Sequence, residues 1–73
     1  MKLHELLKVF KEGQIAEALF MDDKWHIKYS DGHIWYYDLE TNTHYSQVPL
    51  TFSNVNAYYK IIDKEELIWA LID

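Results

Sequence analysis

The chain has 73 residues and no cysteine, so it is long enough for one small domain and has neither a disulfide framework nor a thiolate zinc site. Hydrophobic residues make up 49% of the chain and aromatic residues 16%, which excludes a disordered protein. The net charge is -5, and every basic residue is a lysine. Because surfaces that bind DNA or RNA are positive and rich in arginine, this composition argues against direct nucleic-acid binding.

The sequence also lacks the signals of a membrane or secreted protein. No apolar run approaches the roughly 18 residues that cross a membrane as a helix. Residues 1–5 begin an amphipathic pattern rather than a signal peptide. We therefore expect a cytoplasmic protein with no membrane partner, folded as a single domain over residues 1–73.

The first residues have the periodicity of an amphipathic helix. The helical spacing i, i+3, i+4, i+7 is followed by Leu3, Leu6, Leu7 and Phe10. Gly13 can adopt the left-handed conformation that ends such helices. We predict a helix over about residues 2–12, with its apolar side on a sheet.

The segment that follows fits either a helix or a strand. Alanine and glutamate in residues 14–21 favour a helix, whereas the stop at Gly13 and the terminal apolar cluster favour a new strand. We predict a strand, followed by a turn at Asp22-Asp23.

Residues 24–39 have the pattern of a β-hairpin. Apolar and polar residues alternate up to Asp31-Gly32, the preferred pair for a type I′ turn, and residues 33–39 are rich in β-branched and aromatic residues. Counting back from this turn pairs Tyr29 with Ile34, and it sets the other pairs. Those are Ser30 with His33, Lys28 with Trp35, Ile27 with Tyr36 and His26 with Tyr37.

This register divides the hairpin into two faces. The face that we predict to be core carries Trp25, Ile27, Tyr29, Ile34 and Tyr36. The opposite face carries His26, Lys28, Trp35 and Tyr37. Because it mixes large aromatic rings with cationic or titratable partners, we expect the second face to be partly exposed and to form a binding surface. The alternative is that the helix or a partner subunit covers it.

The remaining elements follow in quick succession. We predict a turn at residues 40–43, a shorter strand at 44–48 that Pro49 ends, and a turn or one short helix at 51–57. A last strand at 58–62 precedes a capping-box-like start at Asp63. The fold is therefore expected to be α+β: an N-terminal helix packed on an antiparallel sheet of four to five strands, with a short C-terminal helix.

The chain end is unusually apolar. We predict that the terminal helix drives self-association, because so many large apolar residues need a docking surface. The residues concerned are Leu67, Ile68, Trp69, Leu71 and Ile72. The alternative is that this helix docks on the sheet of its own chain.

No catalytic or metal-binding motif is present. The four histidines lack HxxxH, HxH or HExxH spacing, there is no cysteine nucleophile or GxSxG elbow, and two glycines cannot form a phosphate loop. The carboxylate pairs Asp22-Asp23 and Glu65-Glu66 are typical of a turn and of a helix start. We expect a protein that is not an enzyme and that uses no metal or cofactor.

One resemblance is to the WW domain. It is carried by Trp25, Asp31-Gly32, residues 35–38, Thr41 and Pro49. At the position of the second, ligand-contacting tryptophan this chain has Ser46, and Tyr45 stands one residue earlier. We therefore carry over no proline-ligand site.

A second resemblance covers nearly the whole chain. The order of its elements is similar to that in small bacteriophage accessory proteins. These elements are an opening helix that ends in Lys11-Glu12-Gly13, a Trp-led strand, a DG hairpin, a Pro-Leu-Thr step at 49–51 and a final strand at 57–62. The Thoeris anti-defence type is the nearest; that family sequesters a signalling nucleotide at a subunit interface. Ala16-Glu17-Ala18 replaces basic and aromatic residues usual there, so the resemblance implies a phage counter-defence setting more than a nucleotide site.

Two functions are consistent with these features. The favoured one is a non-enzymatic inhibitor that binds a host protein, expected to be a nucleic-acid-handling defence factor, through exposed Trp35 and Tyr37 and an acidic surface. The acidic residues are Asp22, Asp23, Asp38 and Glu40. The alternative is an oligomer that sequesters a signalling nucleotide, with Trp35, Tyr37, His26 and Lys28 as its site. The net charge favours the first.

Overall fold

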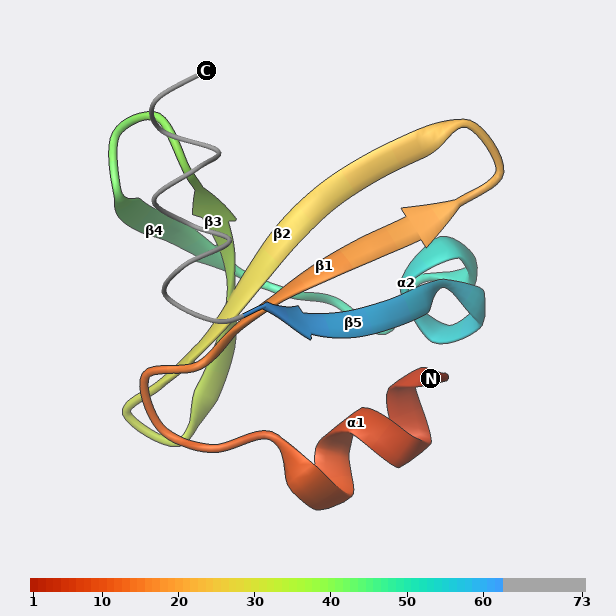
Figure 1. Cartoon of the computed structure of the whole chain (residues 1–73), viewed down its shortest axis with the longest axis horizontal. Helices are drawn as coiled ribbons and strands as arrows, with labels where there is room; N and C mark the ends of the chain where they lie inside the picture. Colours follow the sequence, from red (N-terminus) through yellow and green to blue (C-terminus); the bar gives the residue numbers. More distant parts are fainter. Residues whose placement is uncertain (63–73) are drawn as a thin grey trace.

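The computed structural model describes residues 1–62 and confirms the predicted α+β fold (Figure 1). Its elements in chain order are α1 (Leu3–Val9), β1 (Ile15–Phe20), β2 (Asp23–Ser30), β3 (His33–Asp38), β4 (Thr43–Gln47), α2 (Phe52–Asn56) and β5 (Tyr58–Ile62). The predicted C-terminal helix and its proposed self-association lie outside the described residues. The same holds for the residues assigned to that role, Leu67, Ile68, Trp69, Leu71 and Ile72.

The strands form one antiparallel sheet in the order β4-β3-β2-β1-β5. β1 to β4 are a simple meander, and the chain then passes through α2 to add β5 on the far side of β1. The strand predicted for residues 14–21 is therefore β1, which is paired on both sides. Two paired neighbours explain why this segment is a strand despite its alanines and its glutamate.

The register predicted for the β2–β3 hairpin is confirmed. Asp31 and Gly32 both have positive φ angles, 55° and 77°, as a type I′ turn requires. The preceding turn is displaced by one residue from the prediction at Asp22-Asp23. Phe20 pairs with Asp23, so the two loop residues are Met21 and Asp22, and Met21 takes the positive φ.

Helix α1 packs on one face of the sheet and is shorter than predicted. Phe10 is already extended, and its ring makes an edge contact with the ring of Tyr29 at 5.8 Å between centroids. Because this contact takes Phe10 out of the helical path, the helix ends at Val9. Leu7, which the periodicity assigned to the apolar side, is 53% exposed instead.

The core lies between α1, α2 and this face of the sheet. Its buried members are Leu3, Leu6, Phe10, Ala16, Ala18, Ile27, Ala57 and Tyr59, and the predicted core residues Trp25, Tyr29, Ile34 and Tyr36 pack against them. Ala16 and Ala18 are fully buried, and their small side chains allow the close approach of the elements that cover β1.

A second, smaller apolar cluster lies on the opposite face. It consists of Ile15, Tyr37 and Ile62, with Leu39 packed against them. Tyr37 is 5% exposed. The prediction that Tyr37 is an exposed aromatic anchor is therefore wrong, because the ring fills space beside the apolar side chains of β1 and β5.

Candidate functional site

A cleft opens where β2 and β3 separate. The β2–β3 ladder ends at the pair His26 and Tyr37, beyond which β3 and β4 bend away from the β1–β2 hairpin (Figure 1). The cleft at this point has a volume of about 550 Å³. Its lining comes from two strands, a turn and the edge strand β4: Trp25, His26, Tyr37, Asp38, Leu39, Glu40 and Tyr45.

Three aromatic side chains line the cleft. Tyr45 is 66% exposed and stacks on the ring of Tyr36 at 5.9 Å between centroids, which fixes its orientation on β4. Trp25 packs against the main core, and its Nε1–H is buried without a hydrogen-bond partner among the residues that the structure describes. Tyr37 contributes a buried ring. The cleft lining therefore combines the buried ring of Tyr37, the half-buried ring of Trp25 and the exposed ring of Tyr45.

Two carboxylates lie at the turn that follows β3. Asp38 Oδ1 accepts hydrogen bonds from the backbone N–H of Glu40 at 2.9 Å and of Thr41 at 3.5 Å, so the aspartate both shapes the turn and faces the cleft. Within residues 1–62, neither Asp38 nor Glu40 takes part in a salt bridge. The cleft therefore carries two negative charges that no cation of the described chain balances by direct contact.

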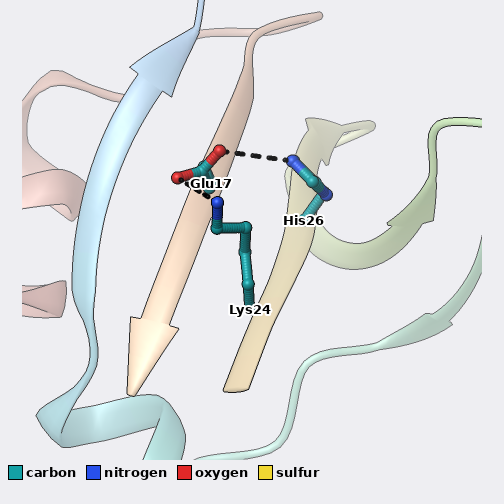
Figure 2. A network of polar contacts seen from close by, with 3 residues as sticks. All are labelled: Glu17, Lys24 and His26. Atoms are coloured by element: carbon teal, nitrogen blue, oxygen red, sulfur yellow. Dashed lines mark ion pairs between the residues drawn. The ribbon is translucent and has the colours of Figure 1, made fainter. Parts of the chain in front are cut away.

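His26 borders the cleft and belongs to a small polar network with Glu17 and Lys24 (Figure 2). Its Nε2 lies 3.8 Å from Glu17 Oε2, and Lys24 Nζ lies 3.8 Å from Glu17 Oε1. Burial lowers the pKa of His26 below its ordinary value of 6.5, although the Glu17 carboxylate opposes this effect. His26 is therefore neutral near pH 7 and does not balance the cleft's charge.

The structure brings four of the eight predicted binding residues to this cleft: His26, Tyr37, Asp38 and Glu40. Lys28 lies on the same face with its ammonium 5.4 Å from the centroid of the Tyr37 ring, outside the cleft lining. Asp22 and Asp23 are exposed at the β1–β2 turn and do not line the cleft either.

Trp35 also lies outside the cleft lining, although its predicted pairing with Lys28 is confirmed. Its Nε1–H donates to the carbonyl of Ser30 at 3.0 Å, and its ring lies 4.9 Å from the ring of His44 between centroids. These contacts hold Trp35 in place and leave it half-buried.

Sequence reasoning missed four residues of the site: Trp25, Leu39, Tyr45 and Glu17. Trp25 was assigned to the core face, and it does pack there, but it also lines the cleft because it lies one residue beyond the end of the β2–β3 ladder. Tyr45 lies within a register irregularity of the β3–β4 ladder, between the pairs Tyr37–His44 and Trp35–Gln47. A bulge of this kind re-aims side chains and cannot be counted from a hairpin turn.

Within residues 1–62, no cluster of three or more histidine or acidic side chains could hold a metal ion. No helix in that part of the chain has the length and apolar character needed to cross a membrane. Comparisons with protein-family models, curated proteins and solved structures found no match to this chain. We therefore infer function from the chemistry of the cleft.

Proposed function

We propose that this protein is a non-enzymatic, phage-type inhibitor that acts in the host cytoplasm by binding a host protein through the aromatic and acidic surface around the cleft. The observation that carries the proposal is the pair Asp38 and Glu40, two carboxylates at an aromatic-lined cleft with no salt bridge among the described residues. Charged groups left without an opposite charge favour association with a complementary surface.

The aromatic residues support a protein partner rather than a catalytic reaction. Tyrosine and tryptophan supply most of the energy at protein interfaces, and the exposed Tyr45 lines the cleft while the half-buried Trp35 lies outside its lining. Catalysis needs a positioned nucleophile or a proton-transfer pair. The neutral His26 has only Glu17 within salt-bridge distance among residues 1–62, and that contact is long at 3.8 Å.

The net charge of -5 supports a basic partner. Proteins that handle nucleic acids carry positive surfaces for the phosphate backbone, and an acidic protein can occupy such a surface in place of DNA or RNA. In a phage setting, the partner that fits this chemistry best is a nucleic-acid-handling defence factor. Binding should then weaken steeply as salt concentration rises.

Capture of partners from host lysate tests the proposal. The intact protein should retain a basic host protein, and the double variant Asp38→Asn with Glu40→Gln should bind it about tenfold or more weakly. A matched control, Asp22→Asn with Asp23→Asn, removes the same charge outside the cleft. It should slow association and leave the dissociation rate nearly unchanged.

Two results would refute the proposal. One is equal binding by the Asp38/Glu40 variant and the wild type. The other is purified protein that carries a bound nucleotide, visible by mass spectrometry, which would support the sequestering alternative. The burial of Tyr37 weighs against that alternative, because a ring that is 5% exposed cannot stack on a base without rearrangement.

A further inference from the structure

The geometry of the cleft points to the group that it holds: we propose that it receives a lysine or arginine side chain projecting from the partner protein. This inference rests on the proposed function and adds the ligand chemistry of its central contact. It is carried by the position of the aromatic rings, the charge of the lining and the placement of the neighbouring lysines outside it.

The charge of the lining selects a cation. Asp38 and Glu40 are the acidic groups of the cleft, and burial keeps His26 neutral near pH 7 by lowering its pKa. An anionic ligand would face two carboxylates, whereas a cationic one would balance them. A neutral apolar ligand would displace water from both carboxylates without forming a hydrogen bond or ion pair to replace it.

The nearest lysines do not occupy this position. Lys24 pairs loosely with Glu17 on the far side of His26, and Lys28 lies over the ring of Tyr37. Neither lines the cleft. Within residues 1–62, Lys24 and Lys28 therefore leave the two carboxylates unbalanced.

The aromatic lining suits an organic cation rather than a hydrated metal ion. Ammonium and guanidinium groups are attracted to the faces of tryptophan and tyrosine rings, and the half-buried Trp25 and the exposed Tyr45 both contribute to the lining. The apolar stem of a lysine or arginine can contact Leu39 and the rings while its charged end reaches the carboxylates. A metal ion would need a cluster of oxygen or nitrogen ligands, which residues 1–62 do not provide.

The size and openness of the site fit a side chain presented on a protein surface. The volume of about 550 Å³ is large enough for the end of a lysine or arginine side chain. Its rim includes Tyr45, which is 66% exposed and can contact the surface that carries the inserted side chain. We therefore assign the cation to a protein side chain and not to a free small molecule.

Titration of the full chain with defined peptides, followed by NMR, tests this inference. The probes are Ac-Gly-Gly-Lys-Gly-Gly-NH₂, the arginine peptide and a norleucine peptide that keeps the alkyl stem without the charge. The lysine and arginine peptides should shift the indole signal of Trp25 and the backbone signals of residues 37–40. The norleucine peptide should bind at least about fivefold more weakly, the factor expected for loss of one cation–π contact.

Variants assign the effect to the cleft. Asp38→Asn with Glu40→Gln should weaken binding of the lysine peptide about tenfold, because both carboxylates are neutralised while the carbonyl oxygen of the introduced asparagine can still accept the turn hydrogen bonds. The charge-matched Asp22→Asn with Asp23→Asn should change it less than about twofold. A spectrum that is unchanged away from the substituted residues shows that each variant is folded.

The outcomes separate this inference from the proposed function. Equal binding of the lysine and norleucine peptides, shifts confined to another surface, or no binding at millimolar peptide would overturn it. Tetramethylammonium binding more tightly than the peptides would overturn the assignment to a protein side chain. If the Asp38/Glu40 variant loses the host partner while the peptides do not bind, the inhibitor proposal stands and the cation pocket does not.

Discussion

The hydroxyl of Tyr59 donates a 2.6 Å hydrogen bond to the backbone carbonyl of Asn54, and this bond fastens the last strand to the short helix before it. Asn54 is itself 1% exposed, and its Nδ2 donates to the Tyr36 hydroxyl at 2.8 Å and to the Pro49 carbonyl at 2.9 Å. A polar network thus lies inside the core, joining α2 to β3, β5 and the loop after β4. Among the described residues Asn54 Oδ1 is buried without a hydrogen-bond partner, so the network ties the crossover together through its donors and leaves one acceptor unsatisfied.

Tyr59→Phe should lower the free energy of unfolding by about 1–2 kcal/mol, because it leaves the Asn54 carbonyl buried without its donor. Tyr58→Phe is the matched control: Tyr58 is 61% exposed, and its ring lies 4.2 Å from Lys2 Nζ, a contact that phenylalanine keeps. Chemical denaturation of both variants measures the difference. Equal stability of the two variants would show that the Tyr59 bond contributes nothing.

The same tyrosine predicts a loss of stability at alkaline pH. Burial, with a smaller effect of Tyr36, raises the pKa of Tyr59 to about 12 from its ordinary value of 10.0. The unfolded chain therefore loses this proton at lower pH than the folded chain, so the stabilisation is complete below pH 10 and is lost as pH rises toward 12. Between pH 10 and pH 12, the free energy of unfolding should fall more steeply for the wild type than for Tyr59→Phe. If the free energy of unfolding falls equally with pH in both proteins, Tyr59 is not the group responsible.

Leu6→Ala should destabilise the fold by about 2–5 kcal/mol, since it leaves a cavity between α1 and the sheet. Leu6 is 0% exposed, whereas Leu7, next to it on the same helix, is 53% exposed. Leu7→Ala should therefore cost less than about 0.5 kcal/mol, the usual limit for a surface substitution. Thermal unfolding of the two variants compares a buried and an exposed leucine at nearly the same helix propensity. Similar losses in both would place α1 in a different rotation on the sheet.

The contrast between Leu6 and Leu7 shows that helical periodicity alone did not predict which leucine of α1 is buried. The type I′ turn at Asp31-Gly32 determined the β2–β3 register, because a two-residue loop leaves no freedom in the pairing that follows. The end of α1 could not be predicted in the same way. It depends on a tertiary contact between Phe10 and Tyr29, and the helix is too short for four apolar positions to share one buried side.

The candidate site was predicted in part for a related reason. His26 and Tyr37 follow from the hairpin register, and Asp38 and Glu40 follow them along the chain. Tyr45 depends on an irregular β3–β4 ladder, which has no marker in local sequence. The exposure of Tyr37 was misjudged because alternation assigns a residue to a face but does not reveal what packs on that face.

Two substitutions around His26 should shift its pKa in opposite directions. The Glu17 carboxylate raises this pKa and the Lys24 ammonium lowers it, while burial keeps the net value below 6.5. Glu17→Gln should therefore lower the pKa of His26 further, and Lys24→Gln should raise it. NMR titration of the histidine ring signals measures both changes in the folded protein. Shifts of the same sign in the two variants would contradict the network in Figure 2.

The lowered pKa also determines how stability should depend on acid. As the pH falls, the unfolded chain protonates His26 near pH 6.5, before the folded chain does. His26 therefore leaves the free energy of unfolding unchanged above pH 6.5 and lowers it increasingly as the pH falls from there to the folded-state pKa. His26→Gln should remove that part of the decline. Glutamine keeps a polar side chain beside Glu17 but does not titrate. The free energy of unfolding of the variant should therefore depend less on pH between 6.5 and the lower pH at which carboxylates become protonated. Denaturation curves of wild type and variant that stay parallel from neutral pH downward would show that His26 is not the group responsible.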